Sequence, residues 1–149
     1  MGVGQVSLKA FDNETNISKK IELGILLCDE FLRKDLDSVK ICSIQLLLLG
    51  NGNKYAEAIG NKFLGSYFIR TGQLSDGIKL MKKAAHYFDV EGDKLSLSEI
   101  YNELGHATSL QGDLSEAKEY YLSSLREGKL SGDETAWFNG ELGLGKIYT

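Results

Sequence analysis

The chain has 149 residues, of which 42% are apolar and 26% charged, as in an ordinary soluble globular domain. The formal net charge is −4 without a block of like charges, which argues against nucleic acid as a partner, because phosphates bind a basic stripe. Proline is absent and glycine occurs seventeen times, a composition that favours helices joined by tight glycine turns. We interpret the adjacent basic pairs as solvated faces: Lys19-Lys20, Arg33-Lys34 and Lys82-Lys83.

No segment is long and apolar enough to cross a bilayer, so we expect no membrane partner. The N-terminus also lacks a basic stretch followed by a hydrophobic core, so no signal peptide is recognised and a cytoplasmic location is expected. Cys28 and Cys42 are then predicted to be small buried thiols in helices rather than a disulfide.

Residues 1 to 16 show no clear period and are expected to form a loose tail. After them, glycines recur every twenty residues, and between these glycines the apolar residues step by three or four, as on amphipathic helices. A helix commonly ends where a residue turns left-handed, which only glycine does without a side-chain penalty. The spacing therefore predicts that each of these glycines ends a helix: Gly52, Gly72, Gly92, Gly112 and Gly132.

An aspartate directly follows three of these glycines, at Asp93, Asp113 and Asp133. Aspartate is a good helix N-cap, and Glu116 stands three residues after Asp113, the spacing of a capping box. Each Gly-Asp pair thus predicts the end of one helix and the start of the next, which gives a string of antiparallel helices.

A finer pattern recurs every forty residues, in the pairs Leu64-Gly65, Leu104-Gly105 and Leu144-Gly145. Because the pairs occur in alternate helices, the repeating unit is a helical hairpin, and the small residue lets a neighbouring helix approach closely. We predict an all-α solenoid of about seven helices in a domain spanning residues 17–149. Its parts are hairpins over about 17–52, 53–92 and 93–132, and a final helix over 133–149.

The third hairpin resembles the tetratricopeptide repeat, through Tyr101, Leu104-Gly105, Ala117 and Tyr121, with Thr108 in place of the second aromatic residue. The preceding unit fits at Leu64-Gly65, Phe68 and Ala84, and departs at Asn61, Gly77 and Met81. The last unit fits at Leu144-Gly145 and Tyr148, with Glu141 at the first aromatic place, and Leu23-Gly24 is similar to an earlier, degenerate copy.

The forty-residue unit exceeds the family's usual thirty-four, and the family's closing proline is missing. With these departures, the repeat is similar to the long repeats of kinesin light chains and of the sensory arms of bacterial regulators. Another α-solenoid or an irregular helical bundle is the alternative. The resemblance implies a right-handed superhelix whose first helices line a concave groove for a peptide or protein partner. Carried over by position, the groove residues are Lys62, Ser66, Arg70, Asn102, His106, Ser109, Asn139 and Lys146, with Ile59, Ile69, Glu99, Leu110 and Leu142 beside them.

The sequence contains no convergent catalytic set, and neither cofactor nor metal is expected. His86 and His106 fall in different helices without further ligands at metal spacing. Gly140 to Lys146 matches part of a phosphate-binding loop, but Ile147 replaces the hydroxyl residue that would hold Mg²⁺, and the stretch falls inside a helix.

The leading hypothesis is therefore a non-catalytic protein-interaction module. An alternative is the sensory or regulatory arm of a longer signalling protein, such as a histidine kinase, nucleotide cyclase or transcription regulator, truncated after residue 149. A homodimer through the terminal helix is a further hypothesis, since that helix carries Trp137, Phe138, Leu142 and Ile147. An enzyme on a helical scaffold is the least favoured class.

Overall fold

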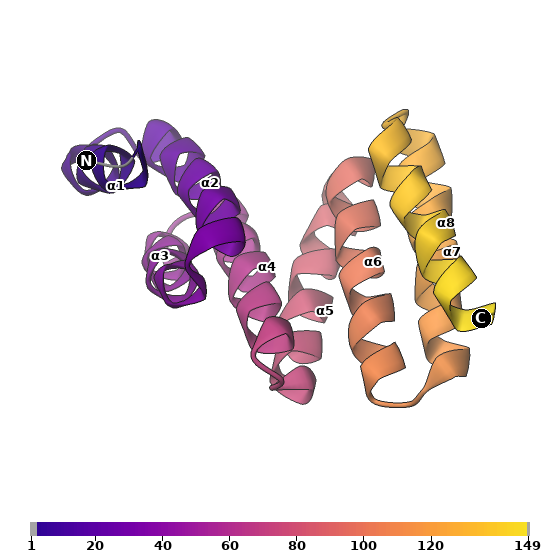
Figure 1. Cartoon of the computed structure of the whole chain (residues 1–149). Coiled ribbons are helices and arrows are strands. Elements are labelled where there is room, and N and C mark those ends of the chain that lie inside the picture. The colour runs from indigo at the N-terminus through magenta and orange to yellow at the C-terminus, as the bar shows by residue number, and fades with distance from the viewer. Residues whose placement is uncertain (1–2, 149) are drawn as a thin grey trace.

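The protein is an α-solenoid in which helices follow one another along a curved row (Figure 1). The computed structural model describes the backbone of residues 3–148 and the side chains of residues 8–147, so Met1, Gly2, Thr149 and the Tyr148 side chain lie outside the described part. Within it, eight helices form and no strand does. They are α1 (Val3–Asn13), α2 (Ile17–Lys34), α3 (Leu36–Leu49), α4 (Lys54–Arg70), α5 (Leu74–Glu91), α6 (Lys94–Leu110), α7 (Leu114–Ser131) and α8 (Glu134–Tyr148).

The three predicted hairpins are α2–α3, α4–α5 and α6–α7, and α8 is the predicted final helix. The loose tail predicted for residues 1 to 16 is wrong for most of its length, because residues 3–13 form α1. Phe11 explains the difference: its side chain is only 1% exposed and belongs to the common core, with Lys20 of α2 over its ring. Tertiary packing therefore stabilises a helix too short to be stable alone.

Four of the five predicted turn glycines are left-handed, with φ of 88° at Gly72, 73° at Gly92, 88° at Gly112 and 78° at Gly132. Gly52 is not, and the prediction is wrong there. The turn after α3 instead continues in right-handed i to i+3 steps, with the Gly52 N–H donating to Leu49 O at 3.4 Å and Asn53 N–H to Gly50 O at 3.3 Å. No left-handed residue is needed to end that helix.

The predicted aspartate caps are confirmed at all three positions. The side chains of Asp93, Asp113 and Asp133 each accept a hydrogen bond of 3.0 Å from the backbone N–H three residues ahead. The capping box at Glu116 is not completed, because the Asp113 N–H already donates to Thr108 O at 3.0 Å in the turn that ends α6. The single N–H of Asp113 cannot donate both to Thr108 O and to the Glu116 side chain.

Close helix approach at the Leu-Gly pairs holds for two of the three. A Cβ on Gly65 would lie 3.1 Å from Met81 of α5, and one on Gly105 would lie 2.8 Å from the Tyr121 ring of α7. At Gly145 a Cβ would meet nothing within 4 Å. In α8 the close contacts come instead from Gly140, against Leu125, and from Gly143, against Tyr121. Tyr121 is thus held between Gly105 and Gly143.

Both cysteines are free and buried, as predicted, at 0% exposure for Cys28 and 1% for Cys42. The Cys42 thiol donates to Gly24 O at 3.5 Å. The hydrogen bond with Cys42, together with burial, raises the pKa of the Cys28 thiol far above its ordinary value. In the part of the chain described here, none of the helices has the length and apolarity to span a membrane.

Candidate binding groove

The first helices of successive hairpins enclose a cavity of about 290 Å³. Asp29 of α2 and Asn139 of α8 both line it, although two hairpins separate them in the chain. Helices α4 and α6 line the cavity between these two helices, through residues that include Lys62, Ser66 and Asn102. The first helices therefore lie around one common space, which is the concave arrangement that the tetratricopeptide resemblance implies.

A second cavity of about 250 Å³ adjoins the first and shares Asn102 and Asn139 with it. His106 of α6 and Lys146 of α8 line its far end, and Tyr121 contributes from α7. We call these two cavities together the inner groove. The two shared amides stand at the junction of its halves.

Two polar bridges connect α4 with α6 across the first half of the groove. Lys62 Nζ lies 2.6 Å from Glu99 Oε2, and Ser66 Oγ donates to Glu103 Oε2 at 2.8 Å. Both bridges join residues 37 positions apart, and both advance by four residues along each helix, so α4 and α6 run parallel in register. The helices are joined here by polar side chains rather than by an apolar seam.

The same positions one hairpin later make no bridge. Forty residues on, Lys62 and Glu99 correspond to Asn102 and Asn139, and Ser66 and Glu103 to His106 and Gly143. In the part of the chain that the structure describes, neither the Asn102 nor the Asn139 side chain has a hydrogen-bond partner. Each amide can therefore donate and accept toward whatever occupies the groove.

The two halves of the inner groove differ in charge. The first half carries Asp29, Glu99 and Glu103 against the single cation Lys62. Burial raises the pKa of the Asp29 and Glu103 carboxyls above their ordinary values, despite the lowering effect of Lys62. The second half carries His106 and Lys146 and no carboxylate. Burial lowers the pKa of His106, and the charges of Lys146 and Arg70 lower it further.

Six of the eight predicted groove residues line one of the two cavities. Arg70 lines neither, since its guanidinium donates to Leu32 O at 3.0 Å, and Ser109 lines neither. Among the neighbours predicted beside them, Glu99 and Leu142 line the groove, while Ile59 and Ile69 are buried in the core at 4% exposure each. For these two residues, the apolar side chain indicates a core position more reliably than the alignment with the family pattern indicates a groove position.

Sequence reasoning missed Asp29 and Glu103 as groove residues. Glu103 belongs to a repeat position that lines the groove three times, as Phe63, Glu103 and Gly143. The forty-residue period could have found it, because the residues at the preceding position, Lys62 and Asn102, were already assigned. Asp29 lies in α2, where the repeat is shifted by one residue; counted from Leu23-Gly24 it corresponds to Arg70, so the shifted register could have found it.

Among the described residues, no three His, Cys, Asp or Glu side chains gather closely enough to hold a metal ion. A scan of protein-family models and searches of curated proteins and of solved structures found no match to this chain. The geometry and charges of the inner groove are therefore the basis for a functional proposal.

Proposed function

We propose that the chain is a non-catalytic interaction module, similar to tetratricopeptide arrays, that holds a peptide segment of a partner protein in the inner groove. The observation that carries this proposal is the pair of unpartnered amides, Asn102 and Asn139, at the junction of the two cavities. A side-chain amide offers a donor and an acceptor, which match the N–H and C=O of a peptide unit. Two such amides on adjacent parallel helices would fix an extended or turned segment.

The charge distribution indicates which charged groups of a bound peptide lie in each half of the inner groove. A lysine or arginine side chain of the partner is complementary to the half with Asp29, Glu99 and Glu103. An aspartate, a glutamate or a terminal carboxylate is complementary to the half with His106 and Lys146. The expected ligand is therefore a peptide with a basic residue at one end and an acidic group at the other.

Selection from a displayed peptide library tests this function. The wild-type chain should enrich peptides with the basic-to-acidic pattern, and the double variant Asn102→Ala, Asn139→Ala should bind them at least about tenfold more weakly, since two hydrogen-bonding groups are lost. The matched control is Ser109→Ala, a predicted residue that lines neither cavity. Unchanged affinity in the double variant would remove the groove from the proposal.

A further inference from the structure

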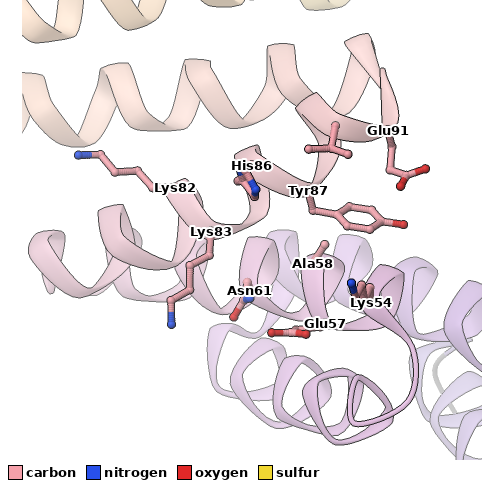
Figure 2. A pocket seen from close by; sticks show the side chains of 10 residues that line it. Lys54, Glu57, Ala58, Asn61, Lys82, Lys83, His86, Tyr87 and Glu91 are labelled. Carbon is pink, nitrogen blue, oxygen red and sulfur yellow. The ribbon is translucent and has the colours of Figure 1, made fainter.

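A cavity larger than either half of the inner groove lies outside it, between α4 and α5. It has a volume of about 670 Å³, within the usual range for small-molecule sites, and we call it the outer pocket. Figure 2 shows Asn61 and Ala58 of α4 facing His86 and Tyr87 of α5. Lys82 and Lys83 lie toward one end of the outer pocket, and Tyr87 and Glu91 toward the other.

The outer pocket and the inner groove use different faces of α4. Asn61 lines the outer pocket and Lys62, its neighbour in sequence, lines the groove. Successive residues of an α-helix point about 100° apart, and Ala58 and Lys54 continue the Asn61 face at helical spacing. A ligand in one site would therefore leave the other site open.

Asn61 is a buried amide without a partner. Its side chain is only 7% exposed, and no side-chain hydrogen bond to it exists among the described residues. The residue is buried as a whole, but its amide atoms still reach the surface, so a ligand or a water molecule can form hydrogen bonds with them there. What remains accessible of the residue opens onto the outer pocket, which it lines.

The same position in the next hairpin is occupied differently. Forty residues on, Asn61 corresponds to Tyr101, whose ring stacks on Tyr120 with centroids 6.2 Å apart. In the second hairpin a small amide replaces the ring, and Leu80 stands where Tyr120 would be. Of these two positions in the second hairpin, only that of Asn61 lines the outer pocket.

The lining of the outer pocket indicates what kind of ligand fits. Ala58, Tyr87 and Val90 provide apolar wall, and Val90 is 70% exposed. Lys54, Lys82 and Lys83 outnumber the carboxylates of Glu57 and Glu91, and His86 adds a further nitrogen donor or acceptor. The two adjacent lysines at one end favour an anionic group there, with the apolar body of the ligand against Tyr87.

We propose that the outer pocket is a second binding site, which takes a small organic carboxylate with an apolar, preferably aromatic body. The carboxylate lies toward Lys82 and Lys83, the aromatic body lies against Tyr87 and Val90, and the Asn61 amide supplies a hydrogen bond. This site is independent of peptide binding in the inner groove, because the lining residues of the two do not overlap.

Titration of the full chain with naphthaleneacetate, followed through backbone amide signals by NMR, tests the proposal. We expect saturable shifts at Ala58, Asn61, His86 and Tyr87. The neutral analogue naphthaleneacetamide should bind about tenfold more weakly, as should naphthaleneacetate to the double variant Lys82→Glu, Lys83→Glu, because both changes remove the charge attraction. The control Lys79→Glu reverses an exposed charge of the same helix outside the outer pocket and should bind as the wild type does.

A filling variant separates loss of the site from loss of the fold. Asn61 lines the outer pocket, so Asn61→Tyr directs a large side chain into it; binding should be lost while the melting temperature stays equal or rises, because an existing cavity is filled. Absence of shifts at the four named residues, shifts confined to the inner groove or α8, equal binding of the neutral analogue, or undiminished binding in Asn61→Tyr would each overturn the proposal.

Discussion

The second and third hairpins share one forty-residue register and are nevertheless packed by different side chains. In the third, the Tyr121 ring fills the space over Gly105, and Ser98 and Ser124 exchange buried hydrogen bonds of 2.7 and 2.8 Å. In the second, two glycines meet: a Cβ on Gly77 would lie 2.9 Å from Gly65 O. One pair of helices is held by a ring and hydroxyls, the other by direct backbone approach.

This difference follows from the positions at which the second unit departs from the tetratricopeptide pattern. Gly77 and Met81 stand where the third unit has Ala117 and Tyr121, and Asn61 stands where it has Tyr101. The first two changes bring α4 and α5 together at one place, and the third places a small amide in the wall of the outer pocket at another. A repeat can therefore keep its helix lengths while the packing at individual positions changes.

The largest expected effect on stability comes from removing the buried Tyr121 ring of the third hairpin. Tyr121→Ala removes a ring that is 3% exposed and lies against glycines of both α6 and α8. We expect the free energy of unfolding to fall by about 3–5 kcal/mol, the usual cost of removing a buried aromatic side chain. Urea denaturation followed by circular dichroism measures it. Leu122→Ala, at a neighbouring site that is 40% exposed, is the control and should lose far less.

The next effect concerns the glycine contact of the second hairpin. Gly77→Ala gains helix propensity of up to about 1 kcal/mol, but the new Cβ would meet backbone atoms, Gly65 O at 2.9 Å and Ile69 N at 3.1 Å. Since α4 and α5 must then separate, we expect a net loss of about 1–2 kcal/mol in the free energy of unfolding.

The control for that substitution should change the free energy of unfolding in the opposite direction. Gly145→Ala makes the same chemical change where nothing lies within 4 Å, and should stabilise α8 by a few tenths to about 1 kcal/mol. The two variants are compared by their denaturation midpoints in urea. If both shifted in the same direction, the close approach of α4 and α5 would not be what Gly77 provides.

The smallest effect tests the bridge between the two hairpins. Burial raises the pKa of Glu103 above its ordinary value of 4.5, so the folded state binds the proton more tightly than the unfolded state does. The contribution of Glu103 to stability is therefore greatest below pH 4.5 and declines as the pH rises through the raised pKa. Glu103→Gln, which can still accept from Ser66, should be more stable than the wild type at pH 7 by less than about 1 kcal/mol and equal to it at low pH.

Urea denaturation at pH 4 and pH 7 checks this prediction. Glu119→Gln, which changes an exposed carboxylate on α7, is the control and should show no such difference between the two pH values. A loss of stability in Glu103→Gln at pH 7 would mean that attraction to Lys62 and Arg70 outweighs the cost of burying the charge.

The sequence by itself determined helices α2 to α8, because the signals that end and begin them are local. A left-handed glycine and an aspartate cap act within one turn of backbone, so Gly92-Asp93, Gly112-Asp113 and Gly132-Asp133 could be predicted from their spacing alone. The resemblance to the tetratricopeptide repeat, carried along the forty-residue period, implied eight groove residues, and six of them line the inner groove, since a repeat returns each position to the same face.

Only the tertiary structure decided which neighbour each position meets. Helix α1 forms because Phe11 packs into the core, Gly143 rather than Gly145 receives the Tyr121 ring, and Asn61 lines the outer pocket. These outcomes depend on contacts between helices and on the volumes of side chains distant in the chain. A local pattern contains neither quantity, so packing sets them when the helices come together.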